Sequence, residues 1–84
     1  MNKIPKIKDI ISEEDPMVHG KFENSFFVLY PIGYDSTQDK YFGYIHPKDG
    51  EPETGTFYAT QLEECNEKEF KPKRLSKLKE EVNA

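Results

Sequence analysis

The longest apolar run in the chain, residues 25–32, predicts a strand because aromatic and β-branched side chains dominate it. Its apolar residues are nearly continuous, which indicates burial on both faces. Proline cannot donate to a sheet ladder, so Pro31 is expected at the end of this strand or on a sheet edge. Weaker alternation predicts two more strands, at residues 17–22 and 40–46. Gly43 inside the latter indicates a bulge or a close backbone approach.

Turn-forming residues separate these segments. Residues 23–25 read as a tight turn, and residues 33–39 as the connection of a hairpin. Residues 47–55 contain two prolines and two glycines and are expected to form a loop. A third short strand is expected at residues 56–59.

The C-terminal third predicts two helices. Thr60 and Glu63 have the spacing of a capping box, which predicts a short helix over residues 61–66 with Glu63 and Glu64 in its first turn. Residues 68–71 are expected to return as an edge strand that Pro72 ends. Residues 74–82 carry apolar side chains at helical spacing and predict a terminal helix.

These elements predict an α+β domain: a small antiparallel sheet of three to five strands with one short capped helix and a C-terminal helix. A small SH3-like barrel is the alternative. With 84 residues the chain is expected to form a single domain. Its core is expected to span about residues 17–72, with a loose N-terminal segment and a basic C-terminal helix.

Aromatic residues are confined to the middle of the chain, between Phe22 and Phe70. Disordered segments are poor in aromatic residues, so this concentration predicts a folded centre. A thin core cannot bury both faces of every strand, and some tyrosines are therefore expected at the surface. Tyrosine is enriched in protein interfaces, and aromatic sheet faces also stack unpaired bases.

Charge is divided unevenly along the chain. Between Asp9 and Glu69 there are 14 acidic and 4 basic residues, whereas Lys71–Lys79 contains 5 basic residues and no acidic one. An acidic body repels nucleic acid and favours basic partners, and a basic tail does the reverse. The expected protein-contact residues are Tyr34, Tyr41, Tyr44, Tyr58, Glu51, Glu53, Glu63, Glu64 and Glu67. The candidate nucleic-acid contacts are Lys71, Lys73, Arg74, Lys77 and Lys79.

No motif for catalysis, metal or cofactor binding stands out. His19, His46 and Cys65 lack the spacing of metal ligands, and the glycines are isolated, so that no phosphate-binding loop is predicted. The single cysteine excludes an intramolecular disulfide. No apolar run has the length of a membrane span. We therefore expect a cytoplasmic protein without catalytic residues, metal or cofactor.

Several motifs together resemble an uncharacterised domain family carried by plasmids, phages and other mobile elements. They are Tyr34-Asp35, Tyr41-Phe42-Gly43, the segment from Gly55 to Glu64, and Phe70-Lys71-Pro72. Two departures are the absence of tryptophan, where the family has a Trp-Tyr pair, and Gln61, where it has an acidic residue. The resemblance implies a mobile-element setting and no chemistry.

Three functions are weighed on this basis. The first is a non-catalytic protein-binding module, an accessory or counter-defence factor whose acidic surface mimics nucleic acid towards a host or element-encoded protein. The second is a single-stranded nucleic-acid-binding protein that uses tyrosines and the basic tail. The third is an enzyme that uses His46 with a carboxylate, which requires a concave pocket at His46.

Overall fold

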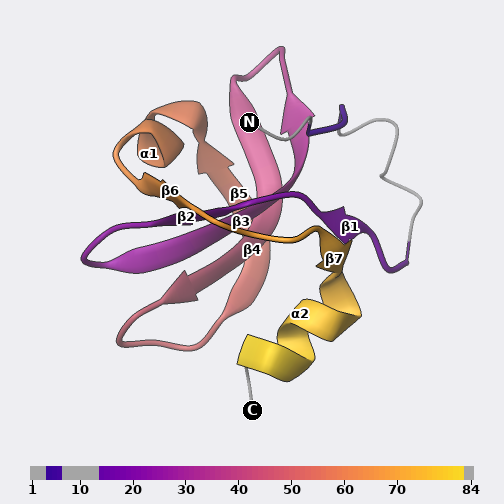
Figure 1. Cartoon of the computed structure of the whole chain (residues 1–84). Coiled ribbons are helices and arrows are strands. Elements are labelled where there is room, and N and C mark those ends of the chain that lie inside the picture. Colours follow the sequence, from indigo (N-terminus) through magenta and orange to yellow (C-terminus); the bar gives the residue numbers. More distant parts are fainter. Residues whose placement is uncertain (1–3, 7–13, 83–84) are drawn as a thin grey trace.

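The computed structural model describes residues 4–6 and 14–82, and its centre is a five-stranded antiparallel sheet (Figure 1). The strands lie in the order β5-β4-β3-β2-β6. Their bounds are Lys21–Glu23 for β2, Phe27–Asp35 for β3, Lys40–Pro47 for β4, Glu53–Tyr58 for β5 and Asn66–Lys68 for β6. The sheet is open, with β5 and β6 at its edges, and the predicted α+β class is confirmed, whereas the closed barrel is not observed.

Two helices and a two-stranded sheet complete the fold. The short strands β1 (Met17–Val18) and β7 (Lys73–Arg74) pair antiparallel beside the larger sheet. Helix α1 (Ala59–Glu63) follows β5, and helix α2 (Leu75–Val82) follows β7. Figure 1 shows the two helices on different sides of the sheet.

The hydrophobic core is divided between the two faces of the sheet. On the α2 side, Tyr30 and Ile32 of β3 pack with Leu75 and Leu78 of α2. On the α1 side, Leu29 of β3 packs in a separate cluster with residues of β2, β5 and α1. Because α2 contributes two buried leucines, the core extends beyond residue 72, the limit expected from the sequence.

Strand β3 is longer than predicted, and Pro31 lies inside it at the centre of the sheet rather than at an end or edge. The Pro31 carbonyl accepts a hydrogen bond from the His19 amide at 3.0 Å and therefore faces away from β4. In an antiparallel strand the nitrogen of a residue faces the same side as its carbonyl. β2 pairs with β3 only as far as Leu29, so the missing N–H of Pro31 removes no sheet hydrogen bond.

A bulge follows Pro31, where the register between β3 and β4 shifts between Pro31 and Gly33. Gly43 of β4 lies opposite, and a Cβ there would lie 2.3 Å from the backbone oxygen of Tyr30. The predicted close approach at Gly43 is thus confirmed, and the extra residue lies on β3. Past the bulge, Tyr34 pairs with Tyr41 and shares its face.

Other predicted boundaries change. The strand expected at residues 17–22 is divided into β1 and β2, because His19 turns its amide towards β3. Gly33–Asp35, expected in the hairpin connection, belong to β3, and β5 begins at Glu53, inside the expected loop. β6 occupies residues 66–68, so only Lys68 of the predicted edge strand at 68–71 is in a strand.

Helix α1 begins at Ala59, two residues before the predicted helix start at residue 61. Its N-cap is Tyr58, whose amide donates to Oε1 of Gln61 at 2.8 Å. Glu63 is the last helical residue and Glu64 the C-cap, so neither lies in the first turn. The prediction failed because the hairpin partner holds the chain as a strand up to Tyr58, where the Ala59 amide donates to the Asp39 carbonyl.

Helix α2 is capped from a distant part of the chain. The Asp15 carboxylate accepts from the Ser76 amide at 2.8 Å and from the Ser76 hydroxyl at 2.7 Å, and the Pro16 carbonyl accepts from the Leu75 amide. The Ser76 hydroxyl and amide bonds, with Arg74 and Lys79 nearby, lower the pKa of Asp15. The segment before β1 therefore fixes the start of α2.

This cap predicts an acid sensitivity. Because the pKa of Asp15 is lower in the folded chain, its contribution to the free energy of unfolding is complete above about pH 4 and is lost as the pH falls further. We expect Asp15→Asn, which keeps an acceptor but no charge, to reduce stability at pH 7 and to lose less than the native chain on acidification. Urea titrations followed by circular dichroism, at pH 7 and at a pH below about 4, measure the free energy of unfolding of both proteins. Equal acid losses in the two proteins would contradict it.

Candidate functional site

Two acidic side chains of the sheet project on the α1 face. Glu53 of β5 pairs with Ile45, and Glu67 of β6 pairs with Phe22. Ile45 and Phe22 belong to the hydrophobic cluster beneath α1. Cross-strand partners share a face of the sheet, so both glutamates project on this side.

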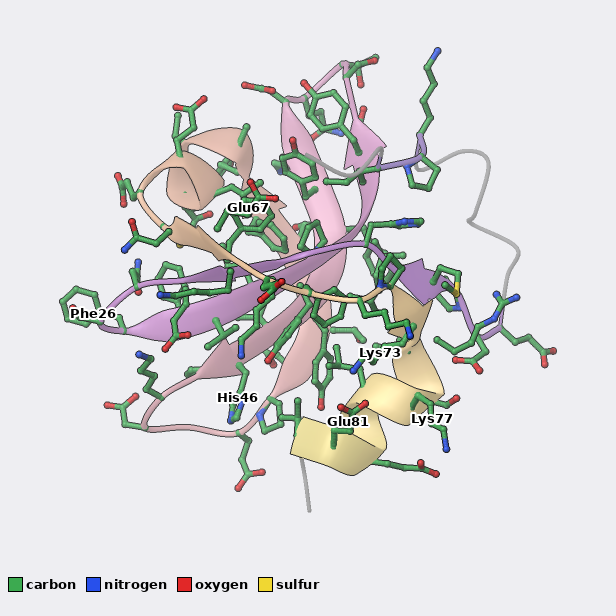
Figure 2. All side chains as sticks on the ribbon, viewed as in Figure 1. Phe26, His46, Glu67, Lys73, Lys77 and Glu81 are labelled. Carbon is green, nitrogen blue, oxygen red and sulfur yellow. The ribbon has the colours of Figure 1, made fainter. Side chains whose placement is uncertain are left out.

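Helix α1 adds two more carboxylates. Leu62 is buried against the sheet and anchors the helix, while Glu63 and Glu64 beside it are exposed. We call this surface the acidic face and define it by Glu53, Glu63, Glu64 and Glu67. Figure 2 shows Glu67 near α1, at the edge strand β6. Glu51 is also exposed, in the loop before β5.

Lysines of the five-stranded sheet lie on the opposite side. Lys21 and Lys68 pair with each other and flank Phe22 and Glu67 in their strands, so they face away from α1. Lys40 shares the face of Phe42 and Tyr44, which pack in the α2-side cluster. The lysines of the five-stranded sheet are therefore confined to one side, where Glu23 and Asp35 accompany them. Among the described residues of this sheet, the charged strand residues on the α1 side are the carboxylates Glu53 and Glu67 alone.

Two of the predicted tyrosines lie on the α1 face. The Tyr41 ring lies 5.8 Å from that of Phe57 in a stacked arrangement and 4.9 Å from that of Tyr34. The Tyr34 hydroxyl donates to Oδ1 of Asp39 at 2.5 Å, and this bond raises the pKa of Tyr34. Burial raises the pKa of Tyr41. Both rings are half-buried and held in place, as suits a rigid contact surface.

The other two predicted tyrosines do not join this face. Tyr44 is buried in the α2-side cluster, with 3% of its surface exposed, so it is unable to serve as a contact residue. Tyr58 is 54% exposed, but it pairs with Lys40 and lies on the opposite side of the sheet, with the Lys40 ammonium 4.9 Å from its ring centre. The acidic and aromatic residues predicted together are thus only partly brought together.

Sequence reasoning missed Phe26, which is 74% exposed. Oδ1 of Asn24 accepts from the amides of Phe26 and Phe27, and the Phe26 carbonyl accepts from the Lys48 amide at 2.9 Å. The turn therefore presents an aromatic ring on a fixed backbone at the end of the sheet (Figure 2). The neighbouring turn residues Asn24 and Ser25 line a shallow pocket of about 400 Å³ together with Glu64, Lys48 and Lys68. The Asn-Ser turn signal could have identified Phe26.

Most of the candidate nucleic-acid contacts have partners within the chain. Lys73 forms an ion pair with Glu81 at 2.9 Å and lies over the Phe70 ring, and Lys77 pairs with Glu80 at 3.6 Å. Arg74 donates to the Asp15 carbonyl at 3.2 Å, and Lys79 lies 5.9 Å from the Tyr44 ring centre. Lys71 is exposed. The basic segment therefore covers β7 and most of α2. Glu80 and Glu81 of α2 partly balance its positive charge.

His46 lies on the wall of an open groove of about 510 Å³ between the sheet and α2 (Figure 2). Tyr30 and Leu78 contribute to its apolar lining. The groove also contains carboxylates, but Glu23 is paired with Lys48 at 2.7 Å and Glu81 with Lys73. The concavity that an enzyme with a catalytic His46 requires is present, while two of the neighbouring carboxylates are engaged in ion pairs.

Cys65 follows α1 and is partly buried against the α1-side cluster. Burial and the nearby Glu64 raise the pKa of its thiol, which disfavours a reactive thiolate. In residues 4–6 and 14–82, no three His, Cys, Asp or Glu side chains are placed to hold a metal ion. No helix in that part of the chain is long and apolar enough to span a membrane.

Comparison of the chain with models of protein families, with curated proteins and with solved structures gave no match.

Proposed function

We propose that this chain is a non-catalytic protein-binding module whose acidic face docks on a basic protein surface. The single sign of charge on the α1 side carries this proposal: Glu53, Glu63, Glu64 and Glu67 share that face, whereas the sheet lysines lie on the other side together with Glu23 and Asp35. A field of one sign steers a partner of opposite charge and fixes its orientation.

Apolar groups near the acidic face supply what charge alone lacks. Phe27 and Ile45 are partly buried beneath α1. The exposed Phe26 belongs to the turn whose residues Asn24 and Ser25 line a pocket with Glu64. Interfaces combine a few aromatic anchors with a polar rim, and exposed ion pairs by themselves contribute little. The acidic face, with the exposed Phe26 at the end of the sheet, offers both elements.

Basic surfaces on intracellular proteins often bind nucleic acid, so an acidic module of this kind competes with nucleic acid for them. With the resemblance to a mobile-element family, this gives an accessory or counter-defence role towards a nucleic-acid-binding protein of the host. The mixed charge around α2 makes that side less suited to the same partner.

The test compares two variants that remove equal charge. Glu53→Gln/Glu63→Gln/Glu64→Gln removes three of the four charges of the acidic face, while Glu14→Gln/Glu69→Gln/Glu80→Gln removes three exposed charges elsewhere. In pull-downs from host lysate we expect the native chain and the second variant to retain the same basic proteins. The first variant should retain about tenfold less of these proteins. Added duplex DNA should compete for these proteins.

Salt dependence is the second readout. Retention should fall steeply from about 50 mM to about 200 mM salt, because exposed charges are screened over this range. Equal retention by both variants, or nothing retained above background at low salt, would contradict the proposal.

A further inference from the structure

The free edge of β5 is the part of the sheet that is open to another strand. β5 has six residues, pairs with β4 without a break in register, and contains no proline. The opposite edge strand, β6, has three exposed residues, two of them charged. Natural sheets protect their edges by short, charged or bulged strands. β6 is short and charged, whereas β5 is longer, has no bulge and carries its one charged residue, Glu53, at its start.

The backbone groups that face outwards on β5 follow from the hydrogen bonds around it. The Pro31 carbonyl faces away from β4, so Pro31 and its partner Gly43 form a pair without mutual hydrogen bonds. The N–H and C=O of Gly43 therefore face β5. Gly55, the partner of Gly43 on β5, turns its own N–H and C=O towards β4. Thr54 and Thr56 therefore face outwards.

Two contacts at the end of β5 agree with this alternation. The Tyr58 amide faces outwards and donates to the Gln61 side chain, while the next amide, that of Ala59, faces inwards and donates to Asp39. The described residues provide no backbone partner for the outward N–H and C=O groups of Thr54 and Thr56.

Charge next to this edge indicates the kind of strand that fits. Glu53 projects on the α1 face at the start of β5, Glu51 precedes it, and Glu63 follows beyond its end. Residues of an added strand that lie beside Glu53 share its face, so lysine or arginine is favoured there. On the other face they meet the small side chains of Thr54 and Thr56, where β-branched residues pack well.

We propose that β5 takes up an extended basic segment of the partner as a sixth strand, with Thr54 and Thr56 providing the backbone hydrogen bonds. This mode of binding rests on the proposed function and specifies its partner as a chain segment that alternates basic and β-branched residues. Two outward-facing residues make a short ladder, so the charge of the acidic face must add to the affinity.

The experiment uses a capped peptide of about seven residues that alternates lysine and valine. Hydrogen exchange followed by NMR should show rapid exchange of the Thr54 and Thr56 amides in the free protein and protection on peptide binding. The Gly55 amide, which faces β4, should be protected in both states. The same peptide with methylated backbone nitrogens keeps its side chains and should bind at least about tenfold more weakly.

Variants of the protein give a matched comparison. Thr56→Pro removes an outward N–H without touching the β4 ladder and should weaken peptide binding about tenfold. Thr56→Val keeps the backbone donor and should bind like the native chain. Circular dichroism checks folding, and if Thr56→Pro fails to fold, the exchange data and the methylated peptide decide.

Three other results would overturn the edge model. Peptide binding without protection of Thr54 and Thr56, and with no effect of methylation, overturns the edge model but leaves acidic-face docking intact. Protection of both amides in the free protein that grows with concentration would assign the edge to a second copy of the chain. No peptide binding at low salt overturns the edge model, while the lysate experiment tests the proposed function independently.

Discussion

Gly43→Ala is expected to remove most of the stability of this protein. A Cβ at position 43 would lie 2.3 Å from the backbone oxygen of Tyr30 and 3.1 Å from Cα of Pro31. Both atoms belong to β3, the central strand, so relief of the clash requires β3 and β4 to separate. We expect a loss of at least about 3 kcal/mol in the free energy of unfolding, a large share of what so small a domain has.

Gly55→Ala is the matched control, because Gly55 is the cross-strand partner of Gly43 on β5. A Cβ at position 55 would meet only Cδ1 of Ile45, at 3.5 Å, an ordinary contact. Its effect should stay within about 1 kcal/mol. Urea denaturation followed by circular dichroism compares the two variants. A Gly43→Ala protein with native stability would show that β3 and β4 do not approach as closely as described.

Ile32→Ala and Leu29→Ala should each cost about 2–5 kcal/mol, because each leaves a cavity in a filled core. Ile32 is 0% exposed in the α2-side cluster, and Leu29 is 2% exposed in the α1-side cluster. Both lie on β3, which the two clusters share. We therefore expect either substitution to lower the stability of both faces together, in one cooperative transition.

Each face has its own probe for this experiment. The NMR signals of the Tyr30 and Tyr44 rings report the α2 side, and the reactivity of the Cys65 thiol reports the α1 side. The two probes should give the same denaturation midpoint in both variants. Thr54→Ala, an exposed substitution, should leave the midpoint nearly unchanged. Loss of protection at Cys65 before the tyrosine signal changes would show that the faces unfold separately.

The residues of the candidate site were largely visible in the sequence, but their grouping was not. The excess of glutamate was plain, and each acidic-face residue was named from it. Which face each glutamate occupies depends on the pairing of Glu53 with Ile45 and Glu67 with Phe22, which are contacts between separate strands. Tyr44 and Tyr58 lie outside this surface for two different reasons: Tyr44 packs under α2, and Tyr58 pairs with Lys40 on the opposite face of the sheet.

By itself the sequence determined the α+β class, the core of the long strand and the division of β4 into two faces. Tyr41 and Ile45 pack on the α1 side and Phe42 and Tyr44 on the α2 side, as alternation predicts. The physical reason is that side-chain alternation in a strand is a local property of the extended backbone.

Only the tertiary structure decided the place of Pro31, the bulge that turns Tyr34 to the face of Tyr41, and the cap that Asp15 provides for α2. Each depends on segments that meet only after folding: Pro31 on the His19 amide, the bulge on the register with β4, and the cap on the docking of the chain before β1. A local pattern carries no information about such partners, because their contacts form between residues distant in the chain.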